Sequence, residues 1–147
     1  LIEVGPAHTN GDVLVHVPSD KVVFTGDILF IEGHPILWAG PVKNWINACD
    51  RIIAMQVDFV VPGHGPVTDN RGVRAVRDYL VYIDTESGMS AIEAAKDIDL
   101  SLFSSWGDAE RIAVNVNSLY REYKGEEQRE EITLLFEQMA ELSGLDG

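Results

Sequence analysis

The stretch Thr25-Gly26-Asp27-Ile28-Leu29-Phe30 decides the interpretation of this 147-residue sequence, because it places a carboxylate just after a β-branched run that favours a strand. Two other stretches share this design. Residues 5–12 (Gly-Pro-Ala-His-Thr-Asn-Gly-Asp) contain His8, and residues 61–66 (Val-Pro-Gly-His-Gly-Pro) contain His64. In each stretch, glycine lets the backbone turn sharply beside one side chain of a type that binds zinc. In combination the three stretches predict a metal site.

The sequence around these stretches predicts an α/β fold. Residues 13–17 and 22–25 are β-branched-rich runs on either side of Pro18-Ser19-Asp20-Lys21, a pattern typical of a hairpin. Apolar residues at helical spacing predict a helix over about residues 42–55, and residues 58–61 form a short apolar run typical of a buried strand. The order strand, helix, strand indicates a helix layer packed on a sheet.

After residue 68 every pattern in the sequence is helical. We therefore expect one part over residues 1–68 and a helical C-terminal extension over residues 69–147. Ser90-Ala91-Ile92-Glu93 is a capping box, Asp108 is a candidate N-cap, and Gly125 is a candidate helix end. The apolar faces of these helices are expected to form core or to pack a homodimer.

Composition narrows the partners and the compartment. The net charge is −13, divided into −4 over residues 1–68 and −9 over the rest, so a phosphate backbone would be repelled and no nucleic acid partner is expected. No apolar run approaches the ~18 residues that a membrane span needs, so no membrane is expected either. The single cysteine, Cys49, excludes an internal disulfide, which suits a cytoplasmic protein. It lies on the apolar face of a predicted helix, so we expect it to be a small buried hydrophobe.

The three stretches together resemble the second half of the metallo-beta-lactamase superfamily. The resemblance rests on the order His-Thr-x-Gly-Asp, then Phe-Thr-Gly-Asp-x-Leu-Phe, then Val-Pro-Gly-His-Gly, and it covers roughly residues 1–68. It implies the second half of an αβ/βα sandwich, with metals at one edge between the halves. It further implies that His8 binds one metal, His64 binds a second, and Asp27 bridges them, with two zinc ions (or iron or manganese) as cofactors. The implied activity is hydrolysis of a small ester, thioester, lactone or related bond by water activated between two cations.

One motif of that superfamily, His-x-His-x-Asp-His in its first half, is missing from this sequence. The four histidines are His8, His16, His34 and His64, and no two of them lie two positions apart. The sequence also begins, at Leu1, inside a strand-like run. We therefore expect a partial chain that is inactive alone, and whose partners are the missing N-terminal half of the same protein and a small-molecule substrate. His16 is expected to be an ordinary strand residue.

Four residues near the predicted ligands are further candidates for the site. Asp12, and with it Thr9, is expected to hydrogen-bond a ligand or a turn amide, as residues behind metal ligands commonly do. His34 and Trp38 follow the bridging aspartate in a loop, where the first could touch substrate or solvent and the second could form a pocket wall. The alternative is a structural loop in which Trp38 packs beneath Trp45.

Two other classes of function remain open at this point. A non-catalytic scaffold or dimerisation module derived from the same fold would account for the missing ligands and the acidic helical part, and absence of bound metal would favour it. Flavin-linked di-iron reductases and persulfide oxygenases of the superfamily share its ligands, and bound iron in place of zinc would identify them. The net charge disfavours the superfamily's nucleic-acid-processing members.

Overall fold

A four-stranded sheet organises the first part of the molecule. The structure is a computed structural model, which describes residues 1–86, 98–125 and 132–144. The strands follow the order β1-β2-β3-β4, with bounds β1 (Ile2–Glu3), β2 (Val13–Val17), β3 (Val22–Phe30) and β4 (Phe59–His64). β2 and β3 form the predicted hairpin around a single 3₁₀ turn, and β3 and β4 run parallel.

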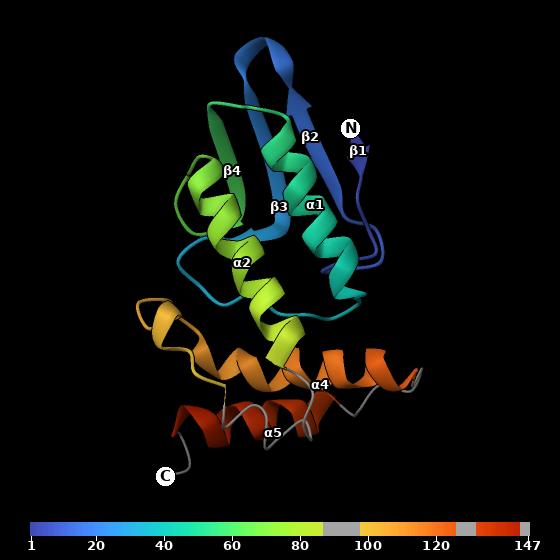
Figure 1. The fold of residues 1–147 in the computed structure, drawn as a ribbon, viewed down its shortest axis with the longest axis vertical. Coiled ribbons are helices and arrows are strands. Elements are labelled where there is room, and N and C mark those ends of the chain that lie inside the picture. Colours follow the sequence, from blue (N-terminus) through green and yellow to red (C-terminus); the bar gives the residue numbers. More distant parts are fainter. Residues whose placement is uncertain (87–97, 126–131, 145–147) are drawn as a thin grey trace.

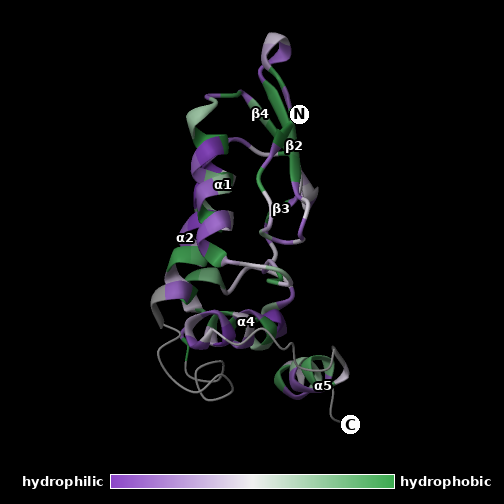
Figure 2. Ribbon diagram, turned by 90° about the vertical axis from the view of Figure 1, so that its right-hand side faces the viewer, coloured by the Kyte–Doolittle hydropathy of each residue, from purple (hydrophilic) through white to green (hydrophobic). Residues whose placement is uncertain are grey.

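Two helices cover one face of this sheet (Figure 2). α1 (Val42–Ala54) is the crossover that two parallel strands require, and α2 (Asn70–Glu86) packs beside it. Cys49 lies in this layer, where burial raises the pKa of its thiol to about 12, so it behaves as the small hydrophobe that was predicted. The fully buried residues that the two helices share with the sheet include Leu14, Val23, Trp45, Ile52, Val60, Val73, Val76, Leu80 and Ile83.

The remaining described helices lie at one end of the sheet (Figure 1). They are the 3₁₀ turns η2 (Ser101–Phe103) and η3 (Ala109–Arg111), followed by α4 (Ile112–Lys124) and α5 (Ile132–Ser143). α4 ends at Gly125, whose φ of +67° confirms the predicted helix end. None of the described helices combines the length and the apolar character that crossing a bilayer requires.

The start of α4 corrects one expectation from the sequence. Asp108 has φ +62° and precedes the 3₁₀ turn η3, so α4 begins four residues later, at Ile112. The Asp108 side chain makes no capping hydrogen bond and pairs instead with Arg111 at 3.1 Å. The prediction that Asp108 caps the helix is therefore wrong. The capping box predicted at residues 90–93 lies outside the described residues.

The face of the sheet opposite α1 and α2 is apolar and exposed. Val13, Val15, Phe24 and Phe59 are between 40 and 59% exposed. Val15 pairs with Phe24 across β2 and β3, and Phe59 pairs with Val22 across β3 and β4. Residues two positions apart in a strand point to the same face, so the four exposed residues all lie on this face. α1 and α2 lie on the other side of the sheet, and α5 lies beyond the end of the sheet (Figure 2).

The mixed α/β architecture and the C-terminal helices predicted from the sequence are confirmed. The division at residue 68 stays a prediction, although residues of α2 after that position share the core of the sheet and α1. Packing of a homodimer through the C-terminal helices also stays a prediction.

Trp45 provides a test of this core. Its ring is fully buried, and its indole N–H donates a 2.7 Å hydrogen bond to the carbonyl of Ile28. Trp45→Phe removes the indole N–H and leaves the Ile28 carbonyl without its hydrogen-bond donor. We therefore expect the free energy of unfolding to fall by about 1–3 kcal/mol. Urea denaturation followed by circular dichroism measures the change. Tyr123→Phe, which removes an exposed hydroxyl from the backbone and carboxylate of Asp84, should have a smaller effect. Equal losses would contradict this account of the core.

Candidate metal centre

Strand pairing brings the three glycine-rich stretches to one end of the sheet. β2 and β3 are antiparallel, so the loop before β2 lies beside the end of β3. β3 and β4 are parallel, so their C-terminal ends meet. The register sets Phe30 beside His64, and the amide of Ile31 donates to the carbonyl of His64 at 2.9 Å. His8, Asp27 and His64 therefore converge although up to 56 positions separate them along the chain.

The two histidines face different oxygens of one carboxylate. His8 Nε2 lies 3.7 Å from Asp27 Oδ2, and His64 Nε2 lies 3.4 Å from Asp27 Oδ1. The His8 side chain is 9% exposed, whereas those of Asp27 and His64 are 46% and 56% exposed. The cluster is thus open to solvent on the side of Asp27 and His64, and His8 lies on its buried side.

A backbone carbonyl fixes which nitrogen of His8 faces the carboxylate. His8 Nδ1 lies 2.9 Å from the carbonyl oxygen of Ile36. A carbonyl oxygen can only accept, so in the neutral ring Nδ1 carries the proton and Nε2 is an acceptor. Two acceptors, His8 Nε2 and a carboxylate oxygen, then face each other. A cation between them would be attracted to both. A backbone carbonyl that accepts from the other ring nitrogen is common behind histidine ligands of metals.

Asp12 supports the backbone on either side of His8. Its carboxylate accepts hydrogen bonds from the amides of Ala7 (3.1 Å) and Thr9 (3.0 Å) and from the Thr9 hydroxyl (2.8 Å). The predicted contact of Asp12 with a turn amide is confirmed. Thr9 in turn accepts from the amide of Gly11 at 3.3 Å. These bonds hold the loop in the conformation that directs His8 inward.

Aromatic rings pack against the two imidazoles, a role that was not predicted from the sequence. Phe30 stacks on His64 with ring centroids 4.4 Å apart and planes 10° apart, and it also lies 5.5 Å from the ring of His8. Trp45 meets His8 edge-on at 5.6 Å. The position of Phe30 at the end of the Asp27 stretch was the available signal in the sequence. Its contact with His64, however, depends on the register of β3 and β4.

Gly63 allows the loop after β4 to approach Asp27. A Cβ atom at this position would overlap Oδ1 of Asp27 and would lie 2.6 Å from the carbonyl carbon of Gly26 and 2.8 Å from the amide nitrogen of Asp27. Glycine is therefore required here for close approach of two backbones, independently of any left-handed conformation. This contact brings His64, the next residue, to the carboxylate.

The structure corrects the expectation for His34. The side chain is fully buried, with the rings of Tyr79, Phe103 and Trp106 around it at centroid distances of 5.0 to 6.4 Å. The prediction that His34 contacts solvent is therefore wrong, because aromatic side chains from α2, η2 and the loop after η2 surround its ring. Neither ring nitrogen has a hydrogen-bond partner among the described residues. Trp38 is partly buried against the core, and its role as a pocket wall stays a prediction.

The donor types of the cluster fit a two-metal site of which this chain supplies a part. Imidazole nitrogen and carboxylate oxygen are both zinc ligands, and one carboxylate with a histidine at each oxygen matches a bridging position. Each pair, however, offers two donors, and a four-coordinate ion needs more. In agreement, no three His, Cys, Asp or Glu side chains within the described residues are arranged to hold a metal ion.

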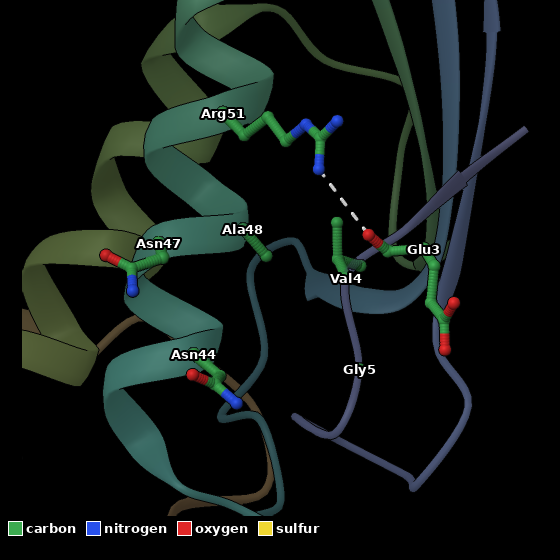
Figure 3. A pocket seen from close by; sticks show the side chains of 7 residues that line it. All are labelled: Glu3, Val4, Gly5, Asn44, Asn47, Ala48 and Arg51. Carbon is green, nitrogen blue, oxygen red and sulfur yellow. Dashed lines mark hydrogen bonds between the residues drawn. The ribbon is translucent and has the colours of Figure 1, made fainter.

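A cleft of about 230 Å³ opens elsewhere, between the β1 region and α1 (Figure 3). Arg51 extends into it and donates to the carbonyl of Glu3 at 3.5 Å, while the Glu3 carboxylate points away from the guanidinium (Figure 3). The cleft is lined by Glu3, Val4, Gly5, Asn44, Asn47, Ala48 and Arg51. None of the three converging side chains lines it, so it is separate from the candidate metal centre.

Comparison with known proteins assigns a family to the part of the chain that carries the cluster. Residues 1–64 match the model of the metallo-beta-lactamase superfamily. A hydroxyacylglutathione hydrolase of Rhizobium meliloti (strain 1021) is 34% identical over 56 residues, which are 38% of this chain and 22% of that protein. Its counterpart in Brucella ovis is 36% identical over 53 residues, 36% of this chain and 21% of that protein. Residues 1–64 therefore belong to the metallo-beta-lactamase superfamily, and the chain spans about a fifth of the length of these curated relatives.

Solved structures show that the likeness in fold extends beyond the matched residues. A stereoselective inverting sec-alkylsulfatase from Pseudomonas sp. superposes with a TM-score of 0.61 at 15% identity, covering 84% of this chain and 23% of that one. A metallo-beta-lactamase family protein from Thermus thermophilus has a TM-score of 0.58 at 18% identity, covering 83% of this chain and 42% of that one. At such identities the likeness concerns the fold alone.

His34 makes a prediction about acid stability. Burial lowers the pKa of His34, Asp108 and Glu110 oppose this, and Arg111 adds to it. The unfolded chain therefore binds a proton at His34 more readily than the folded chain does. The stability that comes from a neutral His34 is complete above the ordinary histidine pKa of about 6.5, and it is lost as the pH falls below that value towards the folded pKa.

We expect His34→Phe to weaken this dependence. Urea unfolding at about pH 7.5, 6.5 and 5.5 should show a steeper loss of unfolding free energy in the unsubstituted chain than in the variant. Parallel losses in the two proteins would contradict a neutral His34 in the folded state.

Proposed function

We propose that the protein of which this chain is a part is a metal-dependent hydrolase with a two-metal, zinc-type site. The observation that carries the proposal is the placement of His8 and His64 at different oxygens of the Asp27 carboxylate. Membership of residues 1–64 in the superfamily and the names of the curated relatives support it. In this proposal His8 binds one metal, His64 binds the second, and Asp27 bridges them.

The residues of this chain have separable tasks in such a site. Two divalent cations held by these residues would supply a more acidic bound water and a polarised bond in the substrate. Asp27 holds the bridging position, and the backbone around Gly63 keeps its carboxylate between the two rings. His8 presents Nε2 because Ile36 holds its other nitrogen. Phe30 packs against both rings.

A thioester is the first substrate class to test. The curated relatives are named hydroxyacylglutathione hydrolases, and an acyl group carried on the thiol of glutathione is a thioester. A small ester or a lactone presents the same kind of acyl carbon and forms the next set of substrates. We propose a cytoplasmic location, which the single buried cysteine supports.

The role of Asp27 can be tested in the full-length protein. Asp27→Ala removes the bridging carboxylate, so we expect the rate of thioester or lactone hydrolysis to fall by at least about a thousandfold and the metal content to fall below two per chain. Elemental analysis and a substrate panel measure both. Asp58→Asn is the matched control, because it removes a carboxylate whose partner is the exposed Lys21. Retained hydrolysis in the folded Asp27 variant would refute the proposal.

The exposed sheet face supports a proposal about the missing partner. We propose that the N-terminal half of the same protein packs on the face that carries Val13, Val15, Phe24 and Phe59, which would complete a sandwich and bring further ligands to the metal centre. Contiguous exposed apolar surface of this kind marks an interaction site, and two packed sheets are a stable arrangement for it. The chain alone, with one histidine per metal, would be inactive.

Binding between the two separately purified halves tests this packing. Phe24→Asp combined with Phe59→Asp places two charges on the face, so we expect roughly a hundredfold weaker association of the halves, measured by titration calorimetry. Leu102→Asp is the control, because Leu102 is 80% exposed in η2, away from the sheet. Equal association of both variants would contradict the proposed interface.

A non-catalytic scaffold is the second candidate function. The incomplete donor set within the described residues favours it for the chain in isolation. Metal analysis of the full-length protein separates the candidates, because a scaffold needs no bound metal and the hydrolase needs about two. Iron in place of zinc would direct attention to the oxidoreductases of the superfamily.

A further inference from the structure

The carbonyl that orients His8 lies in a segment without regular secondary structure. Ile36 accepts from His8 Nδ1 at 2.9 Å, but residues 34–37 belong to no helix or strand. No ladder of backbone hydrogen bonds therefore fixes the direction of this carbonyl. Some other group has to hold the peptide if His8 is to keep one ring nitrogen directed at Asp27.

Asn115, on α4, bonds to the backbone on both sides of Ile36. Its Oδ1 accepts from the amide of Leu37 at 2.9 Å, and its Nδ2 donates to the carbonyl of Pro35 at 2.8 Å. The Leu37 N–H and the Ile36 carbonyl belong to the same planar trans peptide, in which they point in opposite directions. A bond that draws the N–H towards Asn115 therefore directs the carbonyl away from α4, where His8 receives it.

Burial makes this contact strong and specific. Asn115 is fully buried, and its amide also donates to the hydroxyl of the buried Tyr79 at 2.9 Å. Ser118, one turn further along α4, donates to the carbonyl of Leu37 at 2.7 Å. Rotation of the peptide would leave the Leu37 amide and the Asn115 oxygen without partners in an environment closed to water, at a substantial cost in free energy.

We propose that Asn115 is a positioning residue for His8, which acts through the Ile36 peptide to hold the Nδ1–H tautomer of His8 and leave Nε2 free towards Asp27. Its importance for metal binding rests on the proposed function of His8 as a ligand. Asn115 was not among the residues predicted from the sequence to belong to the site. The available signal was a polar residue within the apolar stripe of a predicted helix.

The tautomer of His8 can be measured on the 147-residue chain without metal. In ¹⁵N-histidine NMR at a pH well above the ordinary histidine pKa of about 6.5, the chemical shifts distinguish Nδ1–H from Nε2–H. We expect Nδ1–H in the unsubstituted chain. Asn115→Leu, which keeps the volume and removes both hydrogen bonds, should shift His8 by at least about threefold towards Nε2–H. A merely structural role for Asn115 would not change the tautomer in the chains that remain folded.

Two further variants complete the experiment. Asn117→Leu is the matched control, because Asn117 is buried on the same helix and makes no hydrogen bond to residues 35–37 within the described part of the chain. It should leave the tautomer unchanged. If Asn115→Leu does not fold, Asn115→Ser, whose shorter side chain cannot reach both peptides, should show the same shift. An Nε2–H tautomer in the unsubstituted chain, or an unchanged tautomer in folded Asn115 variants, overturns the proposal.

Zinc affinity of the full-length protein separates this proposal from the proposed function. Loss of groups behind a metal ligand typically weakens binding 10–100-fold, so we expect roughly tenfold weaker zinc binding in Asn115→Leu and no change in Asn117→Leu. A shifted tautomer with unchanged zinc affinity would support the positioning role and contradict the assignment of His8 as a ligand.

Discussion

Parallel pairing of β3 with β4 is the constraint on which the rest of the structure depends. It needs a crossover, which α1 provides, and it places the ends of two glycine-rich stretches side by side. The short distance between Gly63 and Asp27 follows from this pairing, and so does the stacking of Phe30 on His64. The antiparallel hairpin then adds the loop of His8 at the same end of the sheet.

Much of this arrangement could be predicted from the sequence, because it depends on local patterns. Alternating β-branched residues define the hairpin, helical spacing defines α1, and glycine beside a metal-binding side chain defines the three loops. Asp12 was also correctly associated with the loop of His8. In such cases the signal and the structure lie within about a dozen residues of each other.

The features that escaped prediction depend on contacts between distant segments. His34 follows Asp27 in the sequence, where contact with substrate or solvent was one of two alternatives, but α2 and the residues around Phe103 enclose it. Asp108 has the residue type of a cap, yet its left-handed backbone starts a 3₁₀ turn and its carboxylate pairs with Arg111. Asn115 bonds to residues about 80 positions away, and no local pattern indicates which backbone groups it meets.

The contact between α4 and residues 35–37 links two parts of the chain that differ in their resemblance to known proteins. The family match ends at residue 64, whereas the side chain that holds the Ile36 peptide comes from residue 115. Exchange of C-terminal segments between related proteins would therefore alter the surroundings of His8 even if all three glycine-rich stretches were kept intact. A chimaera that joins residues 1–64 to a foreign helical segment would inherit the liganding groups without their support.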